Sequence, residues 1–154
     1  MAAKIAQIAD AIVTLLNGVP IVLDSSAITA VKRYLPPRYD SSGLDSPTLV
    51  VVPLPDVDYA TETRATDRRS YTFGVGLMQR LDDATATGPV EDLLEVAEGI
   101  ATQLAADGNR VLTLADGGAA SLITKSIDPI FNPRALDEFN VFFALITPTY
   151  AVIA

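Results

Sequence analysis

The stretch "RRSYTFGVGLMQR", residues 68–80, alternates between large apolar residues and small ones. The large residues share one face of an extended chain and the small ones share the other: Tyr71, Phe73, Val75 and Leu77 against Ser70, Thr72, Gly74 and Gly76. A period of two is typical of a β-strand, so this stretch predicts one. The face of Ser, Thr and Gly is nearly flat, which would let a helix or a neighbouring chain approach the backbone closely.

The final stretch "FNVFFALITPTYAVIA", residues 139–154, carries no charge. A membrane-spanning helix needs about 20 apolar residues, so this shorter and more polar stretch predicts instead a long buried strand, Phe139–Ile153. Residues 141–146 are apolar on both faces, whereas a sheet that covers a single core keeps one face polar. Both faces therefore need a cover. Either small helices of the same chain lie on both sides, or a second copy of the protein covers one face.

The rest of the chain supplies two helices and further strands. Apolar residues spaced by three and four predict amphipathic helices over residues 3–17 and 89–106. Shorter strands are predicted at 19–23, 28–34, 48–54, 110–115 and 119–127, with an Asp-Gly-Gly turn between the last two. Runs of strands with two segregated helices predict a single α+β domain over residues 1–154. Its sheet is mainly antiparallel, with both helices packed on one face.

Two segments, residues 36–47 and 55–67, read as long irregular loops. The strand 48–54 meets Pro53 and Pro55, and a strand that runs into prolines leaves its sheet or lies at an edge. Loops of this length are uncommon in compact domains unless they are functional or disordered. They carry Tyr39 and Tyr59, which we predict as subunit contacts because tyrosine is enriched at interfaces. "NPRALDE", residues 132–138, reads as a short connector.

Composition limits the chemistry that the chain can perform. There is no Cys, His or Trp, which excludes disulfides, thiolate nucleophiles, imidazole bases and the common zinc sites. Asp82-Asp83 reads as a solvated turn rather than a cation site, and Asp116-Gly117-Gly118 as a turn rather than a phosphate loop. We therefore expect no catalytic, metal-binding or cofactor-binding residues, no cofactor, and a protein that is not an enzyme.

Charge separates the remaining possibilities. The net charge of −8 disfavours sequence-independent binding to DNA or to anionic membranes. Within this acidic chain Arg64, Arg68 and Arg69 lie close together, as a nucleic-acid hook, a catalytic cluster or a contact to another subunit. Glu62 and Asp67 lie among these arginines, which favours ion pairs within or between subunits.

Six motifs follow one another in this order: "IADAIVTLLN", "AVKRYLPP", "LVVVPLP", "RRSYTFGVGLMQRL", "VEDLLEVAEGIATQL" and "FNVFFALITPTYAVI". The likeness that they carry covers nearly the whole chain, from about residue 3 to residue 151. This series resembles the tail terminator and related neck proteins of tailed bacteriophages, including tail completion and minor tail proteins. The motifs are hydrophobic patterns punctuated by Pro and Arg.

The resemblance implies an α+β subunit that forms a homo-oligomeric ring, commonly a hexamer, on the last ring of tail tube protein. Such a protein stops tube growth and offers a surface to the head-completion or connector protein. It resides in the virion after assembly in the host cytoplasm, with DNA only passing through its lumen and no membrane contact. Arg64, Arg68 and Arg69 would then contact the next subunit or the tube. The alternatives are another neck component, such as a head-completion or connector-adaptor protein, and a small-ligand binding module or carboxylate enzyme.

Overall fold

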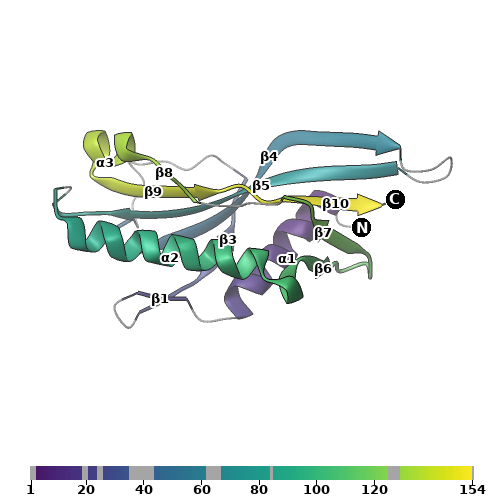
Figure 1. The fold of residues 1–154 in the computed structure, drawn as a ribbon, viewed down its shortest axis with the longest axis horizontal. Helices are drawn as coiled ribbons and strands as arrows, with labels where there is room; N and C mark the ends of the chain where they lie inside the picture. Colours follow the sequence, from purple (N-terminus) through teal and green to yellow (C-terminus); the bar gives the residue numbers. More distant parts are fainter. Residues whose placement is uncertain are drawn as a thin grey trace.

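The computed structural model describes residues 3–18, 21–23, 26–34, 44–61, 67–83, 85–124 and 129–153 (Figure 1). Within these residues, three α-helices accompany a sheet whose strands are mostly antiparallel. The predicted α+β class and mainly antiparallel sheet are therefore confirmed.

The helices are α1 (Lys4–Gly18), α2 (Thr87–Ala105) and α3 (Pro133–Phe139), with a single 3-10 turn, η1 (Asp107–Asn109). The strands are β1 (Ile21–Leu23), β2 (Ser26–Ile28), β3 (Ala30–Lys32), β4 (Thr48–Thr61), β5 (Asp67–Arg80), β6 (Val111–Thr113), β7 (Ala119–Leu122), β8 (Ile130–Phe131), β9 (Val141–Ile146) and β10 (Thr149–Ile153). The helices predicted at 3–17 and 89–106 agree with α1 and α2 to within two residues at each end. None of the described helices is long and apolar enough to cross a membrane.

β5 is the central strand of the main sheet. In the strand order β3-β4-β5-β10-β7-β6, β4 pairs along one edge of β5, while β9 and β10 share the other edge. β9 and β10 keep a single register: Val75 lies opposite Ile146, and Thr72 lies opposite Thr149. Pro148 separates the two strands, and its missing N–H interrupts the ladder without shifting the register. The predicted long final strand is therefore one extended run that a proline divides.

The larger hydrophobic core lies between one face of the sheet and helices α1 and α2. Its fully buried side chains come from all three parts: Ile8, Ile12 and Leu16 of α1, Leu93, Ile100 and Leu104 of α2, and Phe73, Val75 and Leu77 of β5. The apolar face predicted for residues 68–80 is thus buried. On the flat face, a Cβ added to Gly76 would lie 3.3 Å from the Phe143 ring, so glycine leaves room for a large β9 side chain.

A smaller hydrophobic core lies on the other face of β9. It consists of Leu44, Val50, Val52, Met78, Ala135, Val141 and Phe143. Phe142 faces the larger core while its neighbour Phe143 faces the smaller one, and both side chains are buried. Because the chain's own residues cover both faces of β9 and leave only Leu145 half-buried, the hypothesis that a second copy must cover one of them is wrong. The alternative, cover by small helices of the same chain on both sides, is correct in part: one short helix lies over the smaller core, and the longer α1 and α2 lie over the larger one.

The helix that provides this cover is α3, in the segment predicted to be a connector. Its N-terminus is capped by Asn132, whose side-chain oxygen accepts hydrogen bonds from the N–H groups of Arg134 and Ala135 at 3.1 and 3.2 Å. Pro133 follows in the first turn, and Asn140 ends the helix in the left-handed conformation, with φ of 55°. These are the usual boundary signals of helices. They mark a helix too short to be recognised by its periodicity.

The prediction that residues 55–67 form a second long loop is also wrong for most of these residues. β4 continues to Thr61 and β5 begins at Asp67, so only residues 62–66 fall outside the described chain. The prolines do not end β4 because they lie where it is an edge strand, next to a shift in register between Pro53 and Val57. Of the first predicted loop, residues 36–47, the structure describes 44–47, and it buries Leu44.

Candidate functional site

β4 and β5 run on past β9 as a hairpin, which we call the arm: residues 57–61 of β4 and 67–71 of β5. Figure 1 shows β4 bending away from β9 and running beside β5 toward the end of the molecule that carries both termini. The bend coincides with the register shift between Pro53 and Val57. Such a bulge bends a strand and increases its twist, so it sets the direction of the arm.

The outer edge of β4 has no partner strand along the arm in the part of the chain that the structure describes. β3 pairs with β4 only at Leu49–Val51, where Val51 O accepts the N–H of Arg33 at 3.0 Å. Backbone groups of successive residues alternate between the two edges of a strand, so Pro53 faces the same edge as Val51. The missing N–H of Pro53 therefore removes no hydrogen bond to β5.

The same alternation identifies the arm residues that face outward. Phe73 donates its N–H to Pro148 O at 3.0 Å, on the β10 side, and Tyr71 has the same phase. Val57 lies opposite Tyr71, so it turns its backbone N–H and C=O away from β5. The residues in this phase form what we call the open edge: Val57, Tyr59 and Thr61. An open strand edge can accept a further strand.

Two of the predicted interface residues lie on the β5 strand of the arm. Arg69, opposite Tyr59, has an exposed side chain, whereas the side chain of Arg68 is half-buried. Neighbouring residues in a strand point to opposite faces, so the two arginines belong to different faces of the sheet. Arg64 and Tyr39 lie outside the described residues, as does the side chain of Tyr59.

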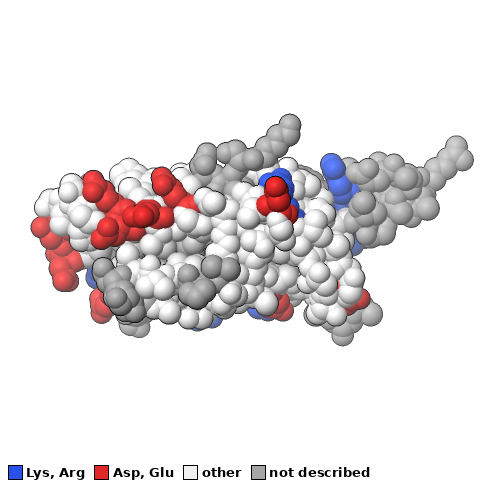
Figure 2. Space-filling view, turned by 60° about the horizontal axis from the view of Figure 1, so that its bottom comes forward, with Lys and Arg blue, Asp and Glu red and all other residues white. Residues whose placement is uncertain are grey.

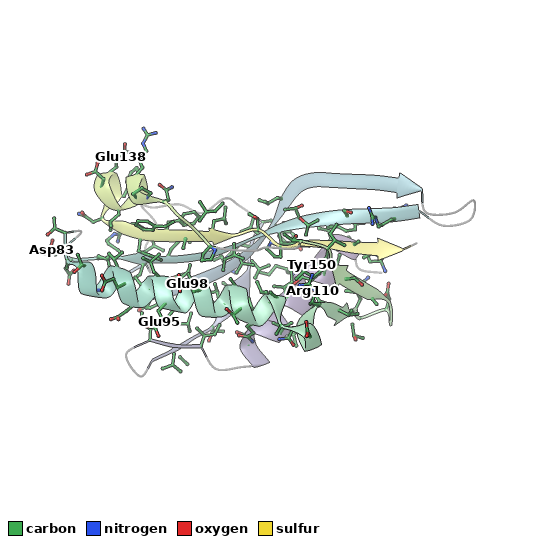
Figure 3. All side chains as sticks on the ribbon, viewed as in Figure 1. Asp83, Glu95, Glu98, Arg110, Glu138 and Tyr150 are labelled. Atoms are coloured by element: carbon green, nitrogen blue, oxygen red, sulfur yellow. The ribbon has the colours of Figure 1, made fainter. Side chains whose placement is uncertain are left out.

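Carboxylates gather at the other end of the molecule, over α2 and the turn that precedes it (Figure 2). The residues concerned are Asp82, Asp83, Glu91, Asp92, Glu95 and Glu98. Figure 3 places Asp83 and Glu138 at this end, far from Arg110. The two ends of the subunit therefore differ, one acidic and one carrying the arm with Arg68 and Arg69. Unlike ends favour head-to-tail contacts over self-complementary ones.

Asp83 belongs to a local turn. Its Oδ1 accepts hydrogen bonds from the backbone N–H of Thr85 at 2.9 Å and from the Thr85 hydroxyl at 2.6 Å. These bonds, the hydroxyl first, hold the pKa of the Asp83 carboxyl below its ordinary value. In the described ranges, no group of three or more His, Cys, Asp or Glu side chains is placed to hold a metal ion.

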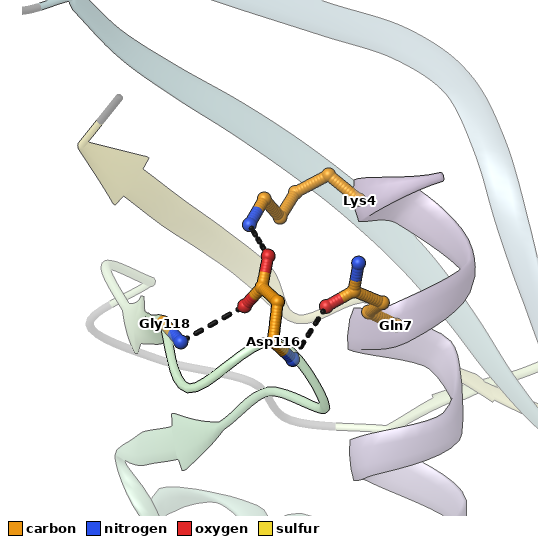
Figure 4. Close-up of polar contacts among 4 residues, drawn as sticks. All are labelled: Lys4, Gln7, Asp116 and Gly118. Carbon is orange, nitrogen blue, oxygen red and sulfur yellow. Dashed lines mark hydrogen bonds and ion pairs between the residues drawn. The ribbon is translucent and has the colours of Figure 1, made fainter. Parts of the chain in front are cut away.

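The Asp-Gly-Gly turn between β6 and β7 attaches this hairpin to α1 (Figure 4). Asp116 pairs with Lys4 Nζ at 2.5 Å and accepts the N–H of Gly118 at 2.9 Å, and its own N–H donates to Gln7 Oε1 at 3.3 Å. The Lys4 ammonium, followed by the Gly118 N–H, lowers the pKa of the Asp116 carboxyl. Gly117 has φ of 85°, which favours glycine. The carboxylate is thus used in structure, as the turn interpretation predicts.

Tyr150 of β10 is a buried polar residue that no sequence pattern singles out. Its side chain is 0% exposed and packs edge-on against Phe73, with ring centroids 6.3 Å apart. Its hydroxyl has no hydrogen-bond partner among the described residues. Burial raises the pKa of Tyr150 to about 12, although the nearby Arg110 acts in the opposite direction. Tyr150 does not line the groove described below.

The arm therefore has the features of an assembly surface: an open edge, two unlike faces and a near-neutral charge, with Arg68 and Arg69 balanced by Asp58 and Asp67, that differs from the acidic far end. No protein-family model matches the chain, and no curated protein matches it.

Proposed function

We propose that this chain is the tail terminator of a tailed bacteriophage, a structural virion protein and not an enzyme. Its copies form a homo-oligomeric ring, a hexamer, on the last ring of tail tube protein. The ring stops tube growth and joins the tube to the head-completion or connector protein, and DNA crosses its lumen. The resemblance of the sequence supports this identity, and the arm supports the assembly step.

The observation that carries the proposal is the open edge of the arm, where Val57, Tyr59 and Thr61 turn their backbone N–H and C=O groups away from β5. The sheet ends on its other side at β6, which pairs with β7 alone among the described strands. Leu114 donates its backbone N–H to Gly118 O at 2.8 Å. Backbone groups of successive residues alternate between the two edges of a strand, so Leu112 turns its N–H and C=O toward β7, whereas Val111 and Thr113 turn theirs toward the outer edge. One such outward residue is Val111, with a side chain 57% exposed.

A subunit with two different open edges can pair the arm of one copy with β6 of the next. That contact is heterologous, and heterologous contacts close into rings when the rotation between subunits allows it. The net charge of −8 supports a lumen that DNA crosses without binding. The apolar faces of β9 contribute nothing to this argument, because the chain encloses both of them.

The first experiment alters the open edge alone. Tyr59→Pro removes one outward N–H and keeps the hydrogen bonds to β5, because Tyr59 faces away from that strand. Tyr59→Ala is the matched control, since it changes the same side chain but keeps the N–H. We expect light scattering after size-exclusion chromatography to show a ring for the wild type and a folded monomer for Tyr59→Pro. Tyr59→Ala, which loses the predicted side-chain contact but keeps the N–H, should still form the ring, at a higher protein concentration than the wild type. A wild-type chain that stays monomeric both alone and with purified tail tubes would overturn the proposal.

Electron microscopy separates a terminator from the other neck components. Tails assembled with a terminator should end in a cap at one uniform length, and tails assembled without it should vary in length. A connector-adaptor protein would remain with the heads and leave tube length unchanged.

A further inference from the structure

β1 and α2 enclose an open groove with an apolar floor. Its volume is about 690 Å³, and its floor is lined by Ile21 and Leu23 of β1 and by Val96 and Ile100 of α2. Ile21, Leu23 and Val96 pack against the larger core and are only half-buried. The apolar surface of the core therefore continues outward into the groove.

One wall of the groove is strongly acidic. Asp92 and Glu95 of α2 line it, and α2 carries two further carboxylates, Glu91 and Glu98, that do not. α2 contains no Lys or Arg, and within the described chain these four carboxylates form no salt bridge. Figure 3 shows Glu95 and Glu98 on α2. The wall thus offers negative charge that the chain itself leaves unbalanced.

Gly99 keeps the middle of the groove wide. It lies inside α2 and lines the groove, and a Cβ added there would meet no atom within 4 Å. Glycine is disfavoured inside a helix because of its backbone entropy, and here no neighbouring atom of the chain requires it. What it leaves is space, in which another backbone could lie close to α2.

β1 supplies the opposite wall and a strand edge. It pairs only with β2 among the described strands, in a two-stranded sheet separate from the main one. All three β1 residues line the groove, including Val22, whose side chain is 52% exposed. An extended segment placed beside β1 could add main-chain hydrogen bonds to apolar contacts, a known mode of peptide recognition.

We propose that the groove between β1 and α2 docks an extended segment of a partner protein in which aliphatic and basic side chains alternate. The aliphatic side chains contact the half-buried floor residues Ile21, Leu23 and Val96. The basic side chains reach Asp92 and Glu95, and the segment's backbone passes over Gly99. Charge complementarity selects this occupant, because an acidic segment would be repelled and an uncharged one would leave both carboxylates unpaired. The inference is independent of ring formation.

The test uses a fluorescent hexapeptide that alternates Lys and Val, with a hexapeptide alternating Glu and Val as the reverse probe. Fluorescence anisotropy should show binding of the Lys-Val peptide and none of the Glu-Val peptide. The double variant Asp92→Asn/Glu95→Gln should weaken binding roughly tenfold. The double variant Glu91→Gln/Glu98→Gln removes the same charge from the same helix but outside the groove, and should weaken binding less than about twofold.

A third variant tests the space over Gly99. Gly99→Leu should abolish peptide binding and leave the melting temperature unchanged or higher, because leucine favours the helix. Equal losses in the two charge variants would reveal general attraction and would overturn the proposal. So would peptide binding that Gly99→Leu does not affect. Self-association of the wild type that Gly99→Leu removes would assign the groove to a second copy, and would also overturn it.

Discussion

β9 and the β4 strand of the arm both pair with β5, yet β9 and the arm differ in what they leave uncovered. β9 is apolar on both faces, and the chain encloses both of them. The arm looks polar and irregular in sequence, and within the described chain it leaves a strand edge open. The hydrophobicity of its side chains indicates that a strand face is buried in the folded protein. It does not indicate whether the same chain or a second copy buries that face. Open edges belong to the backbone, so no side-chain pattern records them.

The largest effect is expected where the chain covers itself. Phe143→Ala removes a ring that is buried in the smaller core, and should lower the free energy of unfolding by about 3–5 kcal/mol. Urea denaturation of the dilute monomer is the measurement. Ile130→Ala, at a side chain 64% exposed, is the control and should change stability by less than about 0.5 kcal/mol. If Phe143→Ala costs no more than its control in the monomer, the cover of β9 is not intramolecular.

The next effect concerns β10, the continuation of β9 beside the arm. Burial raises the pKa of Tyr150 to about 12, so the folded state holds this proton more tightly than the unfolded state. The resulting stability is complete below the ordinary pKa near 10 and is lost as pH rises toward 12. Between about pH 9 and about pH 11.5, the wild type should lose about 2 kcal/mol more than Tyr150→Phe. Urea unfolding at both pH values measures this, and parallel losses would show that the hydroxyl titrates normally.

A smaller effect is expected at the cap of α3. Asn132→Ala removes the acceptor for two backbone N–H groups and should lower stability by about 1 kcal/mol. Asn132→Asp is the matched control, because aspartate caps equally well. Thermal unfolding of the three proteins measures the effect. An alanine variant as stable as the wild type would mean that the capping bonds do not hold α3 over β9.

Sequence predicts well those helices and strands that bury one face, because their apolar residues then recur at the period of the helix or the strand. The alternation of residues 68–80 and the helical spacing of 3–17 and 89–106 each reflect one face against the larger core. α3 is not predicted in this way, because its seven residues make too few turns for a helical repeat of apolar residues to be recognised. Asn132 and Pro133 nevertheless mark where it begins. Here the deciding information is local capping rather than periodicity.

Other features depend on tertiary structure and cannot be predicted locally. The cost of Pro53 in a strand depends on whether its nitrogen faces a neighbour, and that depends on where β3 ends. The missing partner of the Tyr150 hydroxyl likewise follows from packing. Of the candidate site, sequence predicts Arg68, Arg69 and Tyr59 as contact residues, and the predicted strand already puts the two arginines on opposite faces. It does not predict that β4 continues to Thr61 beside them.

The smallest effect is expected from charge at the arm. Arg69→Gln removes one exposed charge, and exposed pairs are weak, so ring assembly should shift to protein concentrations no more than about fivefold higher. Reversing Arg64, Arg68 and Arg69 together to Glu should have a larger effect on ring formation and tube capping. If that triple variant assembles and caps like the wild type, these arginines are not interface residues.

Salt distinguishes this charge effect from the effect of the open edge. At about 1 M salt, charges are screened beyond roughly 3 Å, so Arg69→Gln and the wild type should assemble alike. Tyr59→Pro should remain monomeric at the same salt concentration, because the lost N–H belongs to a backbone ladder that salt does not screen. Light scattering at low and high salt compares the variants directly. If salt restores Tyr59→Pro, the arm associates through its charges and not through its strand edge.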